Sequence, residues 1–367
     1  MPDYTKKFRA AAVQAESVWN DVEGGIDKLI AYSAEAKRNG ADIVAFPEVW
    51  IPGYPWFLWL DSVAWQSQFL IPYAANSLEV GGAQWQRIEA AAREHDIAIA
   101  FGFSERDGGS LYIGQAVIDN TGTTVATRRK LKPTHVERTQ FGEGDGSDVA
   151  VVDTPVGRVG SLSCWEHLQP LTKYAMFAQH EQLHVAAWPS FSIFEGAAFA
   201  LGPEVNNGAS RQYAVEGQTF VLAPCGVIGE AAQELFADTE LKQQLLKRGG
   251  GYARIYGPDG RDLAEPLAPT QEGILYADID YAVILAAKNA ADPVGHYSRP
   301  DVFTLHLQAA GRLPKVSATR PVVKVEADDT DPRPQPVTQP VRPPVAQPVT
   351  QSVRPPVTRP VTQPAAL

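Results

Sequence analysis

The stretch GSLSCWEHLQP, residues 160–170, joins an expected strand to an expected helix. Small, β-compatible residues lead up to Cys164 from Val156, and apolar residues recur at helical spacing after it. Cys164 is therefore expected at a strand-to-helix junction. There the backbone N–H groups and the positive end of the helix dipole favour thiolate over thiol. The alternative is a small buried hydrophobe, as most free cysteines are.

Buried strands and amphipathic helices alternate on both sides of this junction. The expected strands are 8–14, 42–46, 97–104, 111–119, 124–131, 156–163, 183–188 and 219–224, and the expected helices are 21–38, 85–95 and 204–216. Asn120-Thr121-Gly122 is a hairpin signal, and the turn 257–260 predicts a second hairpin between strands 252–256 and 273–279. This mixture predicts a layered α/β fold with antiparallel pairs rather than a doubly wound parallel sheet.

Composition limits the classes of function. The chain has 367 residues, 44% hydrophobic, with a formal net charge of −10, enough for one large core or two ordinary ones. Lys and Arg do not cluster with aromatic residues, so no nucleic-acid partner is expected. No apolar run approaches the roughly 18 residues of a membrane helix, and the N-terminus lacks a signal-peptide pattern. With only Cys164 and Cys225, a disulfide framework is not expected, and we predict a cytoplasmic protein.

The last part of the chain has a different character. From Pro336 onward a four-residue step recurs, as PVTQ, PVRP, PVAQ and close variants. Such a repeat has no face that can bury a core, and its proline content favours extended chain. We therefore predict a catalytic domain over 1–314 and a disordered Pro/Val-rich tail over 315–367.

Two further stretches carry candidate functional groups. Glu48 follows the expected strand 42–46, at the strand end where α/β sheets usually place their chemistry. Aromatic neighbours from Trp50 to Trp59 predict that this carboxylate is desolvated, with a raised pKa suited to proton transfer; the alternative is a surface carboxylate. Lys130 lies at the end of the expected strand 124–131, and Lys132 directly follows that strand, within RRKLKPTHVER. The alternative for this basic run is a solvated face. Strand alternation gives both lysines the same face and does not separate them.

Together these blocks resemble the nitrilase family. FPEVWIPGYP around Glu48, RRKLKPTHVER around Lys130 and the segment Cys164-Trp165-Glu166-His167 match its three signature blocks, in order and at similar spacing. AAWPSFS and DPVGHYSRPD match its nitrile-hydrolysing branch, and the resemblance covers about residues 8–305. It implies a four-layer α-β-β-α sandwich, packed through a helix layer as a homodimer that builds larger homo-oligomers or spiral filaments. It also implies hydrolysis of a small-molecule nitrile to the acid and ammonia, with no cofactor and no metal.

The resemblance also implies roles for single residues. Cys164 would be the nucleophile, Glu48 the proton shuttle, and Lys130 rather than Lys132 the fixed cation. Glu137 corresponds to a second glutamate beside these three groups, where it would raise the pKa of Glu48 further; the alternative is a surface residue paired with Arg138. The amide of Trp165 would help to stabilise negative charge on the substrate.

Other readings stay open. An amidase or N-carbamoyl hydrolase of the same superfamily would use the same three groups, as would a cyanide-degrading relative, and a non-catalytic scaffold could recruit partners through its tail. Tyr54 and Trp188 could line an aromatic pocket, and such a pocket would favour arylacetonitriles with aliphatic nitriles close behind. The alternative is that these rings belong to the core or to an interface. His167 and His296 are interpreted as structural, because neither suits a Cys–His pair or a metal site.

Overall fold

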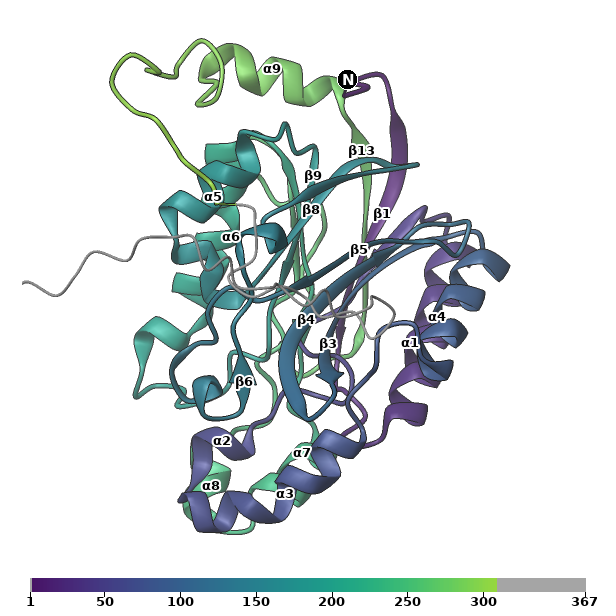
Figure 1. The fold of residues 1–367 in the computed structure, drawn as a ribbon, viewed down its shortest axis with the longest axis vertical. Helices are drawn as coiled ribbons and strands as arrows, with labels where there is room; N and C mark the ends of the chain where they lie inside the picture. The colour runs from purple at the N-terminus through teal and green to yellow at the C-terminus, as the bar shows by residue number, and fades with distance from the viewer. Residues whose placement is uncertain (1, 309–367) are drawn as a thin grey trace, which may run out of the picture. The chain divides into compact units, whose positions relative to one another are not determined.

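A computed structural model describes residues 2–308, and within them two β-sheets lie face to face (Figure 1). The path of the first sheet runs through β11 (Cys225–Gly226), β1 (Lys7–Ala15), β2 (Ile43–Ala45), β3 (Ala98–Asp107), β4 (Ser110–Ile118) and β5 (Thr124–Arg129). Strand β13 (Gly273–Asp280) pairs antiparallel with β1, and β6 (Phe141–Gly142) pairs parallel with β4. Because β1, β2 and β3 are parallel while β3, β4 and β5 alternate, β2 and β5 end at the same edge.

The second sheet contains five strands. Its order is β12 (Arg254–Tyr256), β10 (Phe220–Ala223), β9 (Leu183–Ala187), β8 (Gly157–Ser163) and β7 (Val151–Thr154). The three central strands β8, β9 and β10 are parallel, and an antiparallel strand flanks them on each side. Residues that follow β8 and β9 therefore meet at one edge of this sheet.

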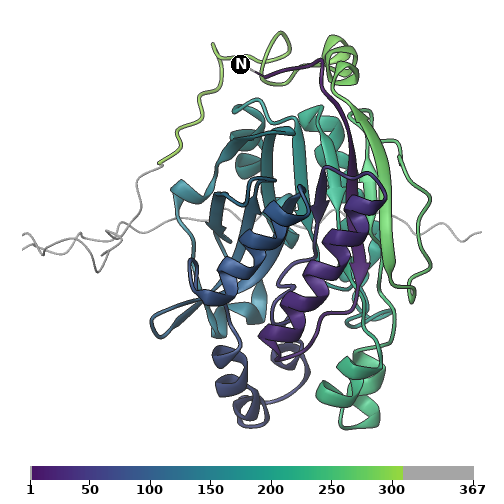
Figure 2. The same ribbon diagram turned by 90° about the vertical axis from the view of Figure 1, so that its right-hand side faces the viewer.

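Helices cover the outer face of each sheet, which gives four layers. Helices α1 (Val22–Arg38) and α4 (Ala83–Glu94) cover the first sheet, as Figure 2 shows face on. Helices α5 (Pro170–Phe177) and α6 (Pro203–Gly217) cover the second. Alternate residues of β1 confirm the layering: Ala10 and Ala12 belong to the core between the sheets, while Ala11 and Val13 pack toward α1. The predicted α-β-β-α sandwich is confirmed.

A third apolar cluster lies at one end of the sandwich. It includes short helices that interrupt the strand pattern, namely α2 (Phe57–Leu60), α3 (Val63–Ala75), α7 (Glu230–Phe236) and α8 (Glu240–Leu245). Aromatic residues dominate it, with Phe57, Phe69 and Phe236 in mutual ring contact. Two of its helices, α2 and α3, connect the loop that holds Glu48 to α4 and β3. At the other end, α9 (Ala282–Ala290) follows β13 (Figure 1).

The second predicted hairpin is wrong. Strand β12 pairs with β10 in the second sheet, whereas β13 pairs with β1 in the first, so the segments around the turn 257–260 separate into different sheets. The turn itself closes only locally, through Gly260 N–H to Gly257 O and a bridge between Tyr256 and Asp262. The predicted turn at 257–260 does form. Because sixteen residues separate β12 from β13, however, the turn does not oblige the two strands to pair, and β13 pairs with β1 instead. The first predicted hairpin, β4 with β5, is confirmed.

Two other expectations have different outcomes. The predicted tail, 315–367, lies outside the described residues, so its structure stays a prediction. Among residues 2–308, no helix is both long and apolar enough to span a bilayer.

Candidate active site

Lys130 lies between two buried carboxylates. Its Nζ is 2.8 Å from Glu48 Oε1 and 2.9 Å from Glu137 Oε2, and all three side chains have no exposed surface. Burial alone would lower the pKa of Lys130, but Glu137 and Glu48 outweigh it and raise that pKa well above its usual value. The structure therefore holds a fixed cation between two carboxyl groups.

The edges of the two sheets bring these groups together. Glu48 follows β2 and Lys130 follows β5, at one edge of the first sheet, whereas Cys164 and Trp188 follow the parallel strands β8 and β9 of the second. The N–H of Glu48 donates to the carbonyl of Trp188 over 3.2 Å, which joins the two edges. The site thus forms where the ends of four strands converge.

Burial raises the pKa of Glu48 to about 8. Lys130 opposes this shift, and Glu137, as a neighbouring carboxylate, adds to it, as the sequence predicted. Oε2 of Glu48 is buried and has no hydrogen-bond partner among residues 2–308. One carboxyl oxygen is therefore anchored by Lys130, and the other is available for proton exchange.

Glu137 has a second set of contacts that fixes its orientation. Oε1 accepts a 2.6 Å hydrogen bond from the hydroxyl of Tyr54, which in turn accepts from the indole of Trp59 at 3.1 Å. Oε2 accepts from the N–H of Thr134 at 2.5 Å as well as from Lys130. Glu137 is therefore a buried part of the cluster, and the alternative of a surface residue paired with Arg138 is excluded.

Cys164 begins a 3-10 turn (Cys164–Leu168) in a left-handed conformation, with φ of 49°. Non-glycine residues rarely adopt this φ, and such strain is typical of functional positions. The expected strand-to-helix junction is confirmed, because β8 ends at Ser163 and the 3-10 turn begins at Cys164, although the α-helix itself begins only at Pro170. The expected preference for thiolate is wrong: burial and the Glu48 carboxyl raise the pKa of Cys164 well above its usual value, against the cation of Lys130 and the N–H of Trp165. The resting group is a thiol.

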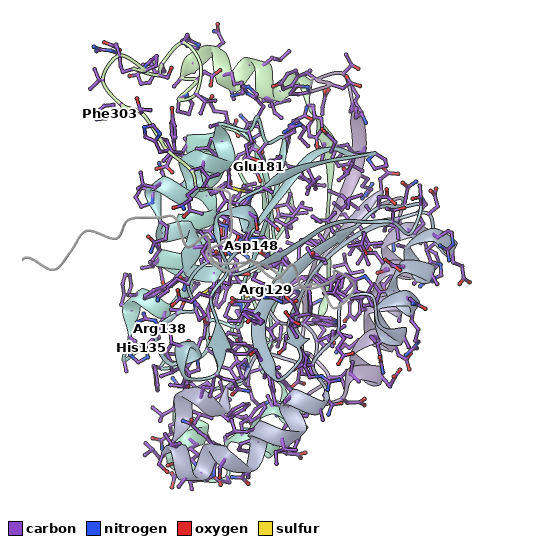
Figure 3. The ribbon with its side chains drawn as sticks, viewed as in Figure 1. Arg129, His135, Arg138, Asp148, Glu181 and Phe303 are labelled. Atoms are coloured by element: carbon purple, nitrogen blue, oxygen red, sulfur yellow. The ribbon has the colours of Figure 1, made fainter. Side chains whose placement is uncertain are left out.

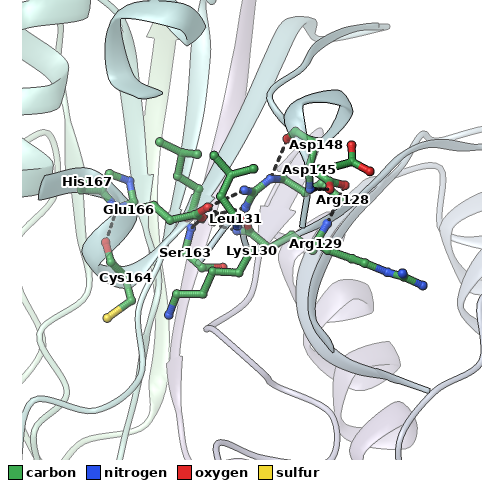
Figure 4. Close-up of polar contacts among 12 residues, drawn as sticks. Arg128, Arg129, Lys130, Leu131, Asp145, Asp148, Ser163, Cys164, Glu166 and His167 are labelled. Atoms are coloured by element: carbon green, nitrogen blue, oxygen red, sulfur yellow. Dashed lines mark hydrogen bonds and ion pairs between the residues drawn. The ribbon is translucent and has the colours of Figure 1, made fainter. Parts of the chain in front are cut away.

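A single carboxylate connects the lysine segment to the cysteine segment. Glu166 accepts hydrogen bonds from the backbone N–H of Leu131 at 2.9 Å and of Ser163 at 2.8 Å, and it pairs bidentately with Arg128 at 2.7 and 2.8 Å (Figure 4). Figure 4 shows the amino group of Lys130 and the thiol of Cys164 pointing toward the same space. Because Glu166 binds the residue after Lys130 and the residue before Cys164, it fixes their spacing.

A cavity of about 30 Å³ opens beside the thiol. The lining includes Cys164, Glu137 and all three predicted pocket residues, Tyr54, Trp165 and Trp188. The Trp165 indole donates to Asn206 of α6 at 3.0 Å, and the Trp188 indole donates to Ser210 at 2.8 Å. These bonds hold two aromatic walls in place. A larger groove beside α6 and β12 contains none of the predicted site residues.

The remaining candidates lie outside the cluster. Lys132 is exposed and pairs with Glu143; since β5 ends at Arg129, strand alternation does not reach it, and the expected shared face with Lys130 is wrong. Nδ1 of His167 contacts the carbonyl of Cys164, at 2.6 Å. His296 is exposed on the chain after α9. Cys225 is fully buried, and burial raises its pKa to about 12.

Comparisons with known proteins agree with this geometry. The model of the carbon-nitrogen hydrolase family matches residues 9–289. The chain belongs to the carbon-nitrogen hydrolase family. It is 54% identical to an aliphatic nitrilase from Rhodococcus rhodochrous over 86% of both chains, and 47% identical to an arylacetone-specific nitrilase from Alcaligenes faecalis over 93% of this chain and 94% of that one. Among solved structures, a carbon-nitrogen hydrolase from Helicobacter pylori shares the fold with a TM-score of 0.62, at 17% identity over 81% of this chain and 97% of that one.

Sequence reasoning missed several residues of this carbon-nitrogen hydrolase site. Arg128 forms the ion pair with Glu166, the carboxylate that connects the lysine and cysteine segments. The N–H of Thr134 donates to Glu137, and the side chain of Asn206 accepts from Trp165. Arg128 and Glu166 both stand inside the blocks quoted for the resemblance, which was the available signal. Asn206 lies on α6 with no motif around it, so only the folded structure reveals its contact.

Proposed function

We propose that this member of the carbon-nitrogen hydrolase family is a nitrilase, which converts an organic nitrile and two waters to the carboxylic acid and ammonia through a covalent bond to Cys164. The observation that carries the proposal is the buried cation of Lys130, shared by two carboxylates beside a strained cysteine. The relatives named above support the choice of a nitrile as substrate.

The first half of the reaction forms a thioimidate. Glu48 takes the proton of the Cys164 thiol as sulfur attacks the nitrile carbon, and it returns that proton to the nitrile nitrogen. A carboxyl with a pKa of about 8 exchanges protons in both directions near neutral pH. A nitrile carbon is a weak electrophile, which suits a sulfur nucleophile. Negative charge developing on nitrogen is stabilised by Lys130 and by the N–H of Trp165.

The second half releases the products. Glu48 takes a proton from water, whose oxygen adds to the thioimidate carbon, and gives that proton to nitrogen. Transfer of the new hydroxyl proton to nitrogen then lets ammonia leave and forms the C=O of a thioester on Cys164. A second water then adds to the thioester carbon in the same way, which releases the acid and restores the thiol. Lys130 keeps its proton throughout, because two carboxylates surround it.

The substrate class follows from the cavity walls. Tyr54, Trp59 and Trp188 give the cavity aromatic surfaces, which favours arylacetonitriles and aliphatic nitriles over charged substrates. At about 30 Å³ the cavity admits little more than the nitrile group, so the rest of a substrate must lie toward the opening or displace a wall. Benzonitrile, phenylacetonitrile and an aliphatic dinitrile together would rank these classes.

An amidase is the second candidate, because the same groups would hydrolyse an amide. The relatives at 47–54% identity favour the nitrile. Ammonia release from a nitrile, its amide and cyanide separates the three activities.

Assembly and location belong to the same proposal. Leu171 on α5 is 72% exposed, and Leu168, Tyr174 and Val215 also leave apolar surface on the outer helix layer. We propose that this layer forms a homodimer, which builds into larger homo-oligomers or filaments. The two free cysteines suit a reducing compartment, so a cytoplasmic location is part of the proposal.

Substitution of each cysteine tests the proposed function. Cys164→Ala should abolish ammonia release from a nitrile while the protein stays folded, because no other group can form the thioimidate. Cys225→Ala is the matched control and should keep nearly full turnover, since its thiol is buried in the apolar core and contacts the backbone carbonyls of Pro189, Gly226 and Gly250. If Cys225→Ala were the inactive variant, the assignment would be wrong.

A further inference from the structure

A chain of buried polar groups runs from the carbonyl of Cys164 to helix α6. His167 Nδ1 lies 2.6 Å from that carbonyl oxygen, and His167 Nε2 lies 2.9 Å from His184 Nε2. His184 Nδ1 is 2.7 Å from Glu181 Oε1, and the hydroxyl of Tyr213 donates to Glu181 Oε2 at 2.6 Å. None of these side chains is more than 4% exposed. The proposed reaction makes no use of them.

The carbonyl at one end fixes the direction of every hydrogen bond. A carbonyl can only accept, so His167 carries its proton on Nδ1 and accepts at Nε2. His184 must then donate from Nε2, which leaves its Nδ1 to accept unless that ring is doubly protonated. In the neutral chain, Glu181 is therefore the donor, and its carboxyl group must carry a proton.

The surroundings favour this neutral form over an ion pair. Burial lowers the pKa of His184 well below its usual value and lowers that of His167 to about 3. Burial also raises the pKa of Glu181 to about 8, partly offset by the hydrogen bond from Tyr213. Near neutral pH the proton therefore resides on the carboxyl group.

We propose that protonated Glu181 is a positioning residue for the nucleophile, which acts through His184 and His167 to hold the backbone carbonyl of Cys164. The proposal deepens the nitrilase assignment and rests on it for the role of Cys164. The backbone of Cys164 is strained, and the bond from His167 is the side-chain contact that holds its carbonyl. The ring of His167 also stacks on Trp188, 5.2 Å between centroids, so the same chain supports one wall of the cavity.

Close packing keeps the Glu181 carboxyl in place. Glu181 lies between the second sheet and the helices α5 and α6 (Figure 3). A Cβ added at Gly160 on β8 would fall 2.0 Å from Oε1 and 2.6 Å from the methyl carbon of Met176. The ring of His184 stacks on Tyr213 at 3.8 Å. The carboxyl group therefore has no room to turn away from His184.

Loss of the Glu181 proton to solvent would reverse the donor and acceptor roles in the hydrogen bonds that link Glu181, His184 and His167. The new carboxylate would accept from Nδ1 of His184, so both histidines would change tautomer. A lone pair of His167 would then face the Cys164 carbonyl, and that hydrogen bond would be lost. Turnover should therefore fall as the pH rises through the pKa of Glu181. The same group contributes stability below about pH 4.5, its usual pKa, and loses it as the pH rises through about 8.

The titratable groups around Glu181 come from several elements. His184 faces it from β9, Tyr213 from α6, and Tyr281, which precedes α9, lies close enough to feel its charge. Beyond His184, Arg128 and Glu166 form their own ion pair, and their effects on His184 are opposite. Gly160 of β8 and Met176 of α5, which lie beside the carboxyl group, are uncharged.

Glu181→Gln and Glu181→Ala test the proposal together. A glutamine amide can donate to His184 and accept from Tyr213, as the protonated carboxyl does, but it cannot ionise. Glu181→Gln should keep neutral-pH turnover within about threefold and remain active at higher pH than the wild type. Glu181→Ala should lose about 100-fold, as expected for a displaced nucleophile. A Glu181→Gln variant as inactive as Glu181→Ala, or with the wild-type alkaline limit, would overturn the proposal.

Two further variants separate proton control from packing. Tyr213→Phe removes a bond that favours the carboxylate, so it should move the alkaline limit to higher pH. Tyr281→Phe is the control: its buried hydroxyl has no hydrogen-bond partner among residues 2–308, and the pH profile should not move. An infrared difference spectrum of wild type minus Glu181→Gln should show a protonated-carboxyl band that disappears at high pH. Absence of that band would contradict the protonated state.

Alkylation of the Cys164 thiol tests the positioning role of Glu181 without any nitrile substrate. In a Cys225→Ala background Cys164 is the only thiol, and its rate of alkylation by iodoacetamide needs no nitrile. Ionisation of Glu48 should raise this rate with pH both in this protein and in its Glu181→Gln variant, whereas only the protein that retains Glu181 should also show a downward step near the titration of Glu181. Identical profiles would overturn the positioning role, whereas a failure of nitrile turnover with the step intact would count against the nitrilase assignment alone.

Discussion

At the residue scale, the site depends on three buried charged groups, in which the Lys130 cation compensates the carboxyl groups of Glu48 and Glu137. Lys130 neutralises part of the cost of burying Glu48 and Glu137, and each carboxylate in turn keeps the lysine charged. Removal of Lys130 leaves two buried carboxyl groups without their cation, and removal of either carboxyl group takes one of its two partners from the lysine. These residues should therefore behave as a unit in kinetics.

Glu48→Gln and Lys130→Ala are each expected to lower turnover on the order of 1,000-fold or more, and the double variant should cost little beyond either. The reason is that the proton shuttle and the cation act in the same transition states. Lys132→Ala is the matched control, because its amino group is exposed and pairs with Glu143. Independent, additive losses, or a Lys132→Ala variant as inactive as Lys130→Ala, would contradict this account.

Much of this cluster could be predicted from single residues in their motifs. Glu48, Lys130 and Glu137 were expected near Cys164, and the structure brings them together. The protonation state of Cys164 was not predictable in this way. Burial and the carboxyl group of Glu48 raise the pKa of Cys164, and Glu48 comes from the other sheet. Together they outweigh the local effect of the backbone N–H groups after Cys164.

At the element scale, one close backbone contact positions Glu48. Gly102 on β3 lies beneath the loop after β2, where an added Cβ would fall 2.6 Å from both the Pro47 carbonyl oxygen and the Val49 nitrogen. Val49 itself has a positive φ of 46°. Because the neighbouring atoms are backbone, only a shift of the loop can relieve such a contact.

Gly102→Ala should therefore displace Glu48 and reduce turnover by about 100-fold, with a smaller effect on folding. Gly109→Ala, in the turn at the far end of the same strand, has open space around its Cβ and is the control. Rates of ammonia release and thermal melts of both variants give the comparison. An alanine at 102 with wild-type turnover would show that the loop adapts.

Elements with a clear hydrophobic period were predictable, and those held by tertiary contacts were not. Strand β1 and helix α1 agree with their predicted ranges within two residues. Helix α3 went unpredicted because its apolar residues follow no single face, and Val63 and Ile71 are exposed. The pairing of β13 with β1 joins residues far apart in sequence, which no local pattern determines.

At the scale of the whole molecule, the four layers place the active site at the convergence of two sheets, and we expect the predicted tail, which lies outside the described residues, to contribute no catalytic group. The matched family model ends at residue 289, and Glu48, Lys130, Glu137 and Cys164 all lie within it. The proline-rich repeat has too few large hydrophobic residues to compensate the entropy of ordering, about 1–2 kcal/mol per residue for the backbone.

A chain that ends after Pro314 should therefore keep its thiol reactivity and most of its turnover per site. Its particle size, by light scattering, is the property expected to change if the tail limits or spaces the assembly. Full-length protein, prepared in parallel, is the reference. Loss of turnover at unchanged particle size would place the tail in the active site.

The central claim is a covalent intermediate on Cys164, and mass spectrometry of enzyme quenched during nitrile turnover tests it most directly. The account predicts an adduct, as the thioimidate or the acyl-enzyme, on the peptide that contains Cys164 and none on the peptide that contains Cys225. Continued turnover with no adduct under any quench would indicate direct attack by water and would contradict the account.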